Sequence, residues 1–144
     1  MDKRIIIGSD HAGFQLKEAL KSYLTGKGFE VRDVGTHEES SVHYPEYGKA
    51  VAQAVQAGEF ERGVLICGTG IGMSITANRF KGVRATLCHD VDTAKLSREH
   101  NNSNVLVLGA RVLAKELAEE MLQAWLDTSF AGGRHQDRLD MIEA

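Results

Sequence analysis

The sequence has 144 residues, of which 42% are hydrophobic and 26% are charged, and its formal net charge is −3 at pH 7. This length is typical of one domain with a sizeable core, so we expect a single domain over residues 1–144. The small net charge gives no electrostatic argument for nucleic-acid binding, and no apolar run is long enough to span a membrane. The charged start is not that of a signal peptide, and two cysteines without a framework spacing indicate a reducing compartment. We therefore expect a cytoplasmic protein that binds neither nucleic acid nor membranes.

Short apolar runs alternate with amphipathic segments along the whole chain. The apolar runs predict five strands, at residues 4–8, 29–34, 64–66, 83–88 and 105–108. The amphipathic segments predict helices at residues 14–24, 47–57, 73–80, 91–99 and 111–126, followed by a short last helix from near residue 134. Alternating strands and helices indicate right-handed crossovers between parallel strands. The sequence thus predicts a three-layer α/β/α, Rossmann-like domain with a five-stranded parallel sheet and a C-terminal helical extension.

Polar residues follow the end of every predicted strand. In chain order they are Asp10 and His11, then Thr36, then the segment 67–72, then His89 and Asp90, and finally Arg111. Ligands of parallel α/β sheets bind at the carboxyl edge of the strands. We therefore expect the functional site at this edge.

The segment 64–75, Val-Leu-Ile-Cys-Gly-Thr-Gly-Ile-Gly-Met-Ser-Ile, is the most informative stretch. A thiol, Cys67, ends the predicted strand, and three glycines at alternate positions open the next helix: Gly68, Gly70 and Gly72. Glycines allow a ligand to approach the backbone, and amides at a helix N-terminus favour negative charge. The same setting lowers the pKa of a thiol. The pattern predicts a basic thiol beside a cradle of amides for a small anion or an oxyanion.

Other interpretations of these residues stay open. Cys67 also fits a small hydrophobic residue that ends a buried strand, and Cys88 is assigned to the same structural role without excluding another. A dinucleotide fingerprint would need glycine where Met73 stands, although Asp90 lies at a suitable distance for a ribose contact. Arg134 and Arg138 share one helix face, which fits either a phosphate clamp or a solvated basic turn. Asp10 also fits a turn residue, and His100 a surface histidine at a helix end.

Five motifs, in order along nearly the whole chain, resemble type B ribose-5-phosphate isomerase, whose wider group includes the subunits of galactose-6-phosphate isomerase. They are Gly8-x-Asp10-His11-x-Gly13, Cys67-Gly-Thr-Gly-Ile-Gly72, His100-Asn101 with Asn104-Val105-Leu106, Gly109-x-Arg111, and Gly132-Gly-Arg134-His-x-x-Arg138. The resemblance implies interconversion of D-ribose 5-phosphate and D-ribulose 5-phosphate without a metal or a cofactor. Some members of the family carry Glu at the position of Met73 and no Cys at position 67, so this sequence is of the cysteine-base type.

The resemblance also implies roles for individual residues. Cys67 moves a proton between C2 and C1 through an enediolate, His100 and Asp10 open the sugar ring, and Thr69 lies beside them. The amides of Gly68, Thr69, Gly70, Ile71 and Gly72, together with Asn101, surround the developing oxyanion. The phosphate-binding set consists of His11, Arg111, Arg134 and Arg138. The family forms dimers with sites between subunits, so His100, Asn101 and Arg111 are expected from a partner chain, and pairing of dimers into tetramers stays open.

The sequence leaves three alternatives to this function open. The nearest is isomerisation of a six-carbon sugar phosphate, allose 6-phosphate or galactose 6-phosphate, decided by pocket depth near Tyr44 and Thr36. The others are a non-enzymatic nucleotide-binding module and a thiol redox sensor that pairs Cys67 with Cys88. A site role for Tyr44 is likewise left open.

Overall fold

Five parallel strands form one sheet in the computed structural model, which describes residues 2–144. The strands are β1 (Arg4–Ser9), β2 (Glu30–Asp33), β3 (Gly63–Cys67), β4 (Ala85–Leu87) and β5 (Val105–Gly109). Their order is β2-β1-β3-β5-β4, and every neighbouring pair is parallel. The predicted five-stranded parallel sheet is therefore confirmed. The chain leaves β1 toward β2 and then crosses to β3 on the other side, which makes the carboxyl ends of β1 and β3 the switch point where ligands bind in such sheets.

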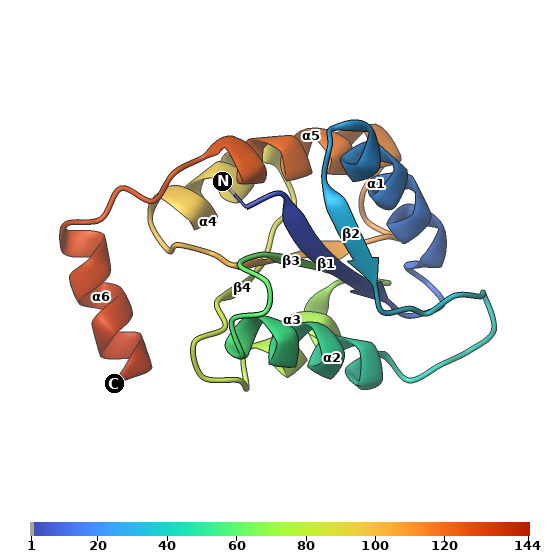
Figure 1. The fold of residues 1–144 in the computed structure, drawn as a ribbon, viewed down its shortest axis with the longest axis horizontal. Helices are drawn as coiled ribbons and strands as arrows, with labels where there is room; N and C mark the ends of the chain where they lie inside the picture. The colour runs from blue at the N-terminus through green and yellow to red at the C-terminus, as the bar shows by residue number, and fades with distance from the viewer. Residues whose placement is uncertain (1) are drawn as a thin grey trace.

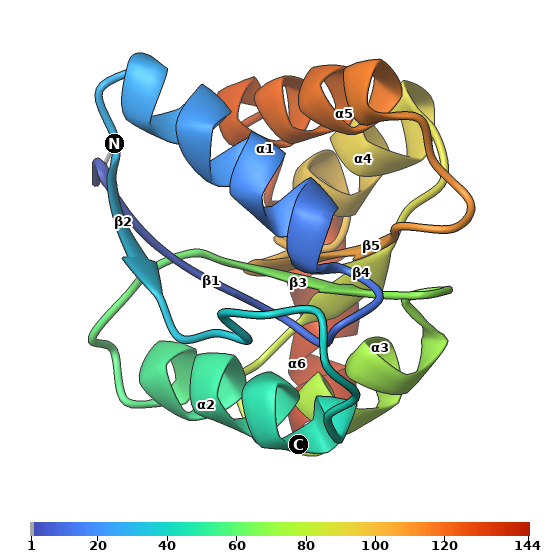
Figure 2. The ribbon, with the colours of Figure 1, turned by 90° about the vertical axis from the view of Figure 1, so that its right-hand side faces the viewer.

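Helices cover both faces of the sheet (Figures 1 and 2). One face carries α1 (Phe14–Gly26), α4 (Val91–Glu99) and α5 (Lys115–Asp127), and the other carries α2 (Tyr44–Gln56) and α3 (Ile71–Ala77). Because both faces are covered, the strands are apolar throughout: Val64 and Ile66 pack toward α1 and α5, while Leu65 and Cys67 pack toward α2 and α3. The expected three layers are confirmed.

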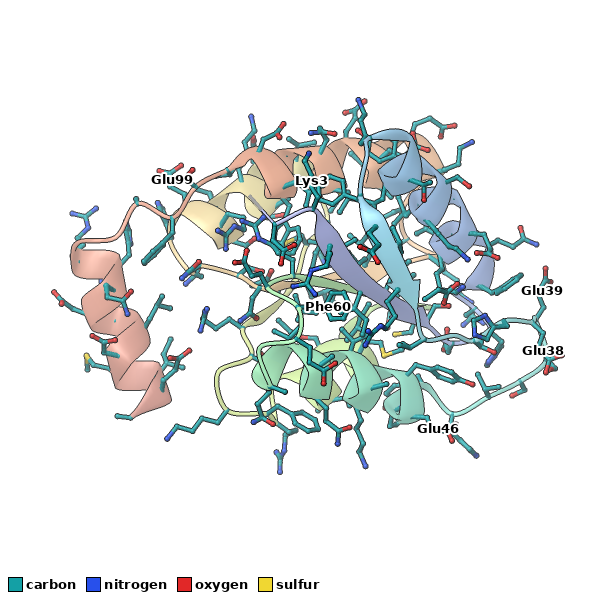
Figure 3. The ribbon with its side chains drawn as sticks, viewed as in Figure 1. Lys3, Glu38, Glu39, Glu46, Phe60 and Glu99 are labelled. Carbon is teal, nitrogen blue, oxygen red and sulfur yellow. The ribbon has the colours of Figure 1, made fainter. Side chains whose placement is uncertain are left out.

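The last helix, α6 (Arg134–Glu143), stands beside this body (Figure 1). Its only buried residue is Leu139, and the side chain of Glu143 at its end forms an ion pair with Arg84 at 2.7 Å. Met141 and Ile142 are 79% and 72% exposed. Figure 3 shows Glu99, at the end of α4, beside the segment that joins α5 to α6, and Ala131 N–H in that segment donates to the Glu99 carbonyl at 3.0 Å. The predicted C-terminal helical extension is confirmed, with most of its surface open.

Some boundaries differ from the prediction. α5 begins at Lys115, not at residue 111, because Ala114 has an extended backbone with a ψ of 149°, while the N–H groups of Val112 and Leu113 both donate to the Gly109 carbonyl in a separate turn. α2 begins at Tyr44, three residues early, with Pro45 in its first turn. β4 is limited to Ala85–Leu87. None of the helices within residues 2–144 is long and apolar enough to cross a membrane.

Candidate active site

A hollow of about 410 Å³ opens at the carboxyl edge of the sheet. We call it the Cys67 hollow, and its lining residues are Asp10, Tyr44, Cys67, Gly68, Thr69, Ile71, Gly72, Ile75 and Arg111. These residues follow β1, β3 and β5 or begin α2 and α3, so segments far apart in the sequence meet here. Ser9 pairs with Ile66 in the sheet register, which sets Asp10 and Cys67 on adjacent strand ends. The hollow therefore lies at the switch point of the sheet.

Cys67 ends β3 with its side chain on the face covered by α2 and α3, and it is 5% exposed. The N–H of Gly70 donates a hydrogen bond to its sulfur at 3.2 Å. Gly70 has a φ of 84°, and a Cβ there would lie 2.5 Å from Leu87 Cδ1. Only glycine fits this backbone and this contact, so the loop geometry that aims an amide at the sulfur depends on Gly70. The thiol belongs to the apolar core and also forms part of the wall of the hollow.

The loop after Cys67 presents main-chain donors beside the thiol. Thr69 Oγ1 accepts from the Ile71 N–H at 3.3 Å, while the amides of Gly72 and Met73 lie in the first turn of α3, where a helix supplies no acceptor of its own. The ring of Tyr44 packs on Gly72 so closely that a Cβ at that glycine would overlap it. Tyr44, whose role the sequence leaves open, is therefore a wall residue of the hollow. No spacing signal could have found it, because 28 positions separate it from Gly72.

Asp10 and Arg111 flank the thiol from the neighbouring strands. Asp10 is 7% exposed, and its Oδ1 accepts from the Gly13 N–H at 3.0 Å, so it shapes the turn into α1 and lines the hollow at once. The guanidinium of Arg111 lies over Gly68, with Nη1 3.0 Å from where a Cβ of that glycine would stand. The resemblance implies that Arg111 comes from a partner chain; here the chain's own Arg111 lines the hollow, because β5 lies next to β3 and its carboxyl end abuts Gly68.

His11 lies on the same turn as Asp10 but does not line the hollow. Its Nδ1 accepts from the Val42 N–H at 3.2 Å and so ties the turn after β1 to the loop between β2 and α2. Within one chain His11 is thus a neighbour of the site.

The remaining predicted site residues do not join Cys67 within one chain. His100 follows the last turn of α4, Asn101 is the next residue, and Arg134 and Arg138 lie on α6. The imidazoles of His100 and His135 stack with centroids 4.3 Å apart and planes 13° from parallel. Desolvation and the nearby charges of His100, Arg134 and Arg138 lower the pKa of His135. These residues form a second group around the start of α6.

Topology explains why the two groups are separate. α4 starts at the carboxyl edge of β4 and runs back toward the amino edge, so its end, at His100, lies next to the start of β5. The five residues of β5 span roughly 16 Å at about 3.3 Å per residue. A proton relay needs heavy atoms about 3 Å apart or one bridging water, so His100 is out of reach of Cys67 in its own chain.

Cys88 and Asp90 serve the structure of β4 and α4, while His89 between them is exposed. Cys88 is 2% exposed, lies outside the Cys67 hollow, and burial raises the pKa of its thiol. Asp90 is the N-cap of α4, with its carboxylate accepting from the Thr93 N–H at 2.7 Å. The carboxylate that a dinucleotide fingerprint would direct at a ribose is thus engaged in capping a helix.

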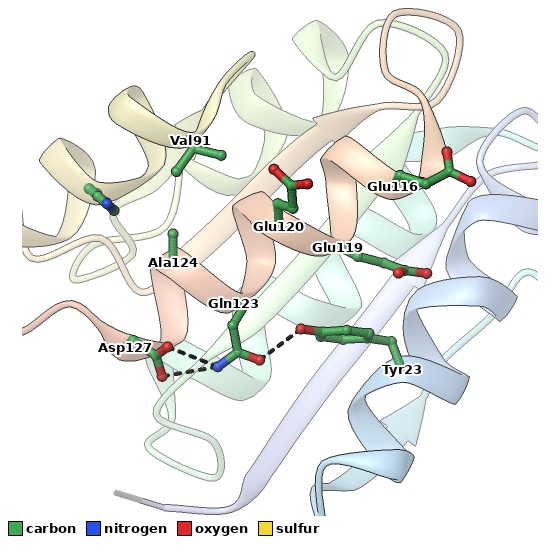
Figure 4. A pocket seen from close by; sticks show the side chains of 9 residues that line it. Tyr23, Val91, Glu116, Glu119, Glu120, Gln123, Ala124 and Asp127 are labelled. Atoms are coloured by element: carbon green, nitrogen blue, oxygen red, sulfur yellow. Dashed lines mark hydrogen bonds between the residues drawn. The ribbon is translucent and has the colours of Figure 1, made fainter.

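A larger hollow, of about 480 Å³, lies on the outer side of α5, toward α1 and α4 (Figure 4). Its lining contains Glu116, Glu119, Glu120 and Asp127, against one cation, Lys95. Gln123 bridges Tyr23 and Asp127 across its floor. Carboxylates at this density repel an anionic ligand. The Cys67 hollow, with its amides and Arg111, is therefore the better candidate for a phosphorylated substrate.

The ribose/galactose isomerase family matches residues 5–142. Ribose-5-phosphate isomerase B of Escherichia coli is 48% identical over 142 residues, which is 99% of this chain and 95% of that protein. The structure of a ribose 5-phosphate isomerase of Thermotoga maritima is 52% identical with a TM-score of 0.96, and 97% of each chain is covered. A Mycoplasma genitalium ribose-5-phosphate isomerase B with bound ribulose 5-phosphate is 39% identical with a TM-score of 0.93, covering 96% of this chain and 93% of that one. On this evidence of sequence and fold together, the chain belongs to the ribose/galactose isomerase family.

Proposed function

We propose that this protein interconverts D-ribose 5-phosphate and D-ribulose 5-phosphate in the Cys67 hollow, a reaction of the non-oxidative pentose phosphate pathway. The observation that carries the proposal is the pairing of the Cys67 sulfur with the Gly70 amide, at 3.2 Å, in a hollow that also contains Arg111. Relatives over nearly the full chain length are named for this reaction. Both cysteines are free thiols, which agrees with a reducing, cytoplasmic location.

The proposed chemistry moves one proton between two carbons. The thiolate of Cys67 takes the proton from C2 of the open-chain aldose, and the C2–H electron pair forms the C1–C2 double bond as negative charge develops on the C1 oxygen. A proton also passes from the C2 hydroxyl to the C1 oxygen, and return of the first proton from Cys67 to C1 leaves the C2 carbonyl of the ketose. One hydrogen-bond donor at such an oxyanion contributes roughly 2.7–4 kcal/mol to the transition state. Within the predicted cradle of Gly68 to Gly72, the amides of Gly70 and Ile71 already donate to the Cys67 sulfur and to Thr69 Oγ1, so we assign the amides of Gly68, Thr69 and Gly72 as the donors. Thr69 lies beside this step, and Asp10 acts in ring opening.

We assign the phosphate group to arginines. Arg111 lines the hollow over Gly68, and Arg134 and Arg138 follow one another by a helical turn on α6. A guanidinium stays charged and donates two parallel hydrogen bonds to phosphate oxygens. Binding at the far end of the sugar positions C1 and C2 against Cys67 and so raises the rate of proton transfer. His11, beside Asp10, completes this set.

We further propose that the enzyme is a homodimer whose sites lie between subunits. His100, which we assign to ring opening, Asn101, Arg134 and Arg138 lie away from Cys67 in one chain, so a second chain must bring them to the hollow. Two apolar side chains at the rim, Ile71 and Ile75, are 54% and 62% exposed, and α6 leaves Met141 and Ile142 open. A two-fold dimer would cover both patches and complete two sites at once.

Subunit complementation tests the shared site. Cys67→Ala and His100→Asn chains, each carrying a different affinity tag, are co-expressed, and the mixed dimer is purified. In a shared site one of the two hollows is intact, so the mixed dimer is expected to recover about half of the wild-type turnover while each parent dimer stays inactive. A mixed dimer as inactive as its parents would overturn the shared site. Wild-type activity on ribose 5-phosphate, measured in parallel, tests the reaction itself.

The identity of the sugar is tested separately, because a relative from Pectobacterium atrosepticum, 43% identical over 140 residues, is named D-erythrulose-4-phosphate isomerase. The protein is incubated in D2O with one sugar phosphate at a time, and NMR records the sugar signals. The four substrates are ribose 5-phosphate, allose 6-phosphate, galactose 6-phosphate and D-erythrulose 4-phosphate. We expect deuterium at the carbons next to the carbonyl and the highest kcat/KM with ribose 5-phosphate. A higher kcat/KM with a four- or six-carbon sugar would reassign the substrate.

A further inference from the structure

A second basic hollow, of about 330 Å³, lies at the amino edge of the sheet, away from the Cys67 hollow. Three arginines line it: Arg62 just before β3, Arg84 just before β4, and Arg98 in the last turn of α4. We call it the arginine hollow. It shares no lining residue with the Cys67 hollow, and none of the residues assigned to the isomerase reaction lines it.

Arg98 is the buried member of the three, at 6% exposure. Its Nε donates to the Thr128 carbonyl at 3.2 Å, and its Nη1 donates to Asn102 Oδ1 at 2.9 Å and to the Ser103 carbonyl at 2.5 Å. All three acceptors are neutral, and among residues 2–144 no carboxylate forms an ion pair with Arg98. This guanidinium is held rigidly while its charge stays without a counter-ion.

The other two arginines, Arg62 and Arg84, add positive charge to the same hollow. Arg62 donates from Nη1 to the Trp125 carbonyl at 3.3 Å and lies 5.1 Å from the centre of that ring, with no ion pair in the described part of the chain. Arg84 has one carboxylate partner, Glu143 of α6. Burial and the charges of Arg62 and Arg84 lower the pKa of Arg98 to about 10. Against three guanidiniums the hollow therefore has two carboxylates nearby, Glu143 and the exposed Glu61.

Several guanidinium donors remain unused around the hollow. The Nη2 group of Arg98, and the Nε and Nη2 groups of Arg62, donate to no acceptor within residues 2–144. These donors are not sealed in the core, because Ser9 Oγ is the one fully buried side-chain polar atom without a partner in the described chain. Because both side chains line the hollow, a ligand bound there can accept hydrogen bonds from these donors.

We propose that the arginine hollow binds a phosphate group, either as inorganic phosphate or as a small phosphomonoester. Guanidinium forks match the spacing of phosphate oxygens and form charge-assisted hydrogen bonds with them. A dianion between Arg62, Arg84 and Arg98 supplies the counter-charge that the protein itself lacks there. The volume admits the phosphate and a short appended group. The arginine hollow contains none of the residues assigned to the isomerase reaction, although His100 and Asn101 follow Arg98 by two and three residues at the same edge of the sheet.

The test uses the full-length protein in phosphate-free buffer at constant ionic strength. Side-chain 1H–15N NMR follows the arginine Nε–H signals while inorganic phosphate is added, with Arg138→Ala as the background so that binding at the proposed active site is weakened. We expect saturable shifts of the Arg98 and Arg62 signals. In a parallel titration glycerol 3-phosphate distinguishes a phosphomonoester site from a site for the free ion. Absence of shifts at both arginines with both probes would overturn the proposal.

Variants supply the second measurement, by calorimetric titration with phosphate. Loss of one charged hydrogen bond weakens binding roughly tenfold or more, so Arg62→Gln and Arg84→Gln are expected to raise the Kd by that factor. Arg62→Lys keeps the positive charge but lacks the two parallel donors of a guanidinium. Its Kd for phosphate is expected to lie between those of the wild type and Arg62→Gln. Arg79→Gln removes an exposed arginine outside the hollow and serves as the matched control, with an unchanged Kd. Arg62→Gln is also expected to keep the wild-type kcat and KM for ribose 5-phosphate. An unchanged Kd in both Arg62→Gln and Arg84→Gln would reject the site whatever the activity assay reports.

Discussion

The N–H of Gly70 points at the sulfur of Cys67, 3.2 Å away, so the first residue before α3 fixes the thiol at the end of β3. The same strand end meets Asp10 from β1 and Arg111 from β5. A nucleophilic sulfur, a carboxylate and a guanidinium thus converge on one hollow through the adjacency of three parallel strands. The consequences can be tested residue by residue.

Replacing Cys67 by alanine is expected to remove the proton-transfer step and leave the fold intact. A general base contributes about 10²- to 10⁴-fold, so kcat should fall by at least about 10²-fold. Ribose 5-phosphate should still bind in calorimetry, because the arginines that we assign to its phosphate are unchanged. Cys88→Ala is the matched control: it removes the other buried thiol, which lies outside the hollow, and should keep kcat. Full turnover in Cys67→Ala would refute the assignment of the base.

Gly70→Ala is expected to lower the stability of the protein by more than the left-handed backbone at this position accounts for. Gly70 and Gly82 have nearly the same φ, 84° and 86°, but a Cβ at Gly70 would strike Leu87 and the Leu108 backbone, whereas Gly82 faces open space. Each alanine costs about 1–2 kcal/mol of stability for the left-handed backbone, and Gly70→Ala adds about 1–3 kcal/mol for overpacking. Denaturant melts measure both variants, and kcat should fall only in Gly70→Ala. Equal destabilisation of the two variants would show that the contact with Leu87 is unimportant.

The sequence predicted the sheet well because burial on both faces leaves nearly continuous apolar runs, as in 64–66 and 105–108. The sequence also predicted a site at the carboxyl edge, because polar residues follow each strand and parallel strands bring those ends together; the structure shows a hollow at that edge. The sequence misjudged the start of α5, because the apolar spacing of Leu113 and Leu117 continues the helical pattern upstream. The extended backbone at Ala114 starts the helix anew at Lys115. The turn before it is held by a bond from Arg111 N–H to the Gly68 carbonyl, which joins residues 43 positions apart and leaves no local signal.

The sequence also could not predict where the second group of site residues, around the start of α6, lies in the fold. His100, Asn101, Arg134 and Arg138 match the same motif set as Cys67, and a motif carries no information on which edge of the sheet each residue occupies. Only the path of α4 back to the amino edge separates His100 from Cys67. Expecting His100 and Asn101 from a partner chain therefore stays a prediction, and complementation between variant subunits is its test.

Arg138→Ala is expected to weaken substrate binding with little change in kcat. The side chain is exposed on α6, and no hydrogen bond or ion pair holds it within residues 2–144, so its removal should leave stability unchanged. Loss of one charged hydrogen bond to phosphate raises KM roughly tenfold or more. Arg79→Ala, another exposed arginine, is the control and should keep the wild-type KM. A KM unaltered by Arg138→Ala would remove this residue from the phosphate-binding set.

The ion pair between Lys17 and Asp33 predicts how stability depends on pH. The side chain of Lys17 is fully buried, and its Nζ lies 2.5 Å from Asp33 Oδ2, while Lys21 reaches the same oxygen at 3.2 Å with its side chain 40% exposed. Burial alone raises the pKa of Asp33, but the hydrogen bonds from Lys17, Gly35 N–H and Lys21 outweigh it and hold the pKa below its usual 3.8. A carboxyl with a lowered folded-state pKa stabilises the fold above the unfolded-state pKa, about 3.9, and loses this effect as the pH falls through the folded value.

Asp33→Asn is therefore expected to be most destabilising near neutral pH. It leaves the buried Lys17 with Glu18, 3.5 Å away and 45% exposed, as its remaining carboxylate partner. Removing one partner of a buried pair costs about 3–5 kcal/mol, so we expect a loss at the lower end of that range at pH 7. Below about pH 4 the wild-type carboxyl itself takes up a proton, so the difference between wild type and variant should shrink. Urea melts between pH 3 and pH 7 measure both curves, with Lys21→Met as the control because a partly exposed pair contributes at most about 1 kcal/mol. A gap that stays constant from pH 7 to pH 3 would mean that the charge of Asp33 is not what holds β2 against α1.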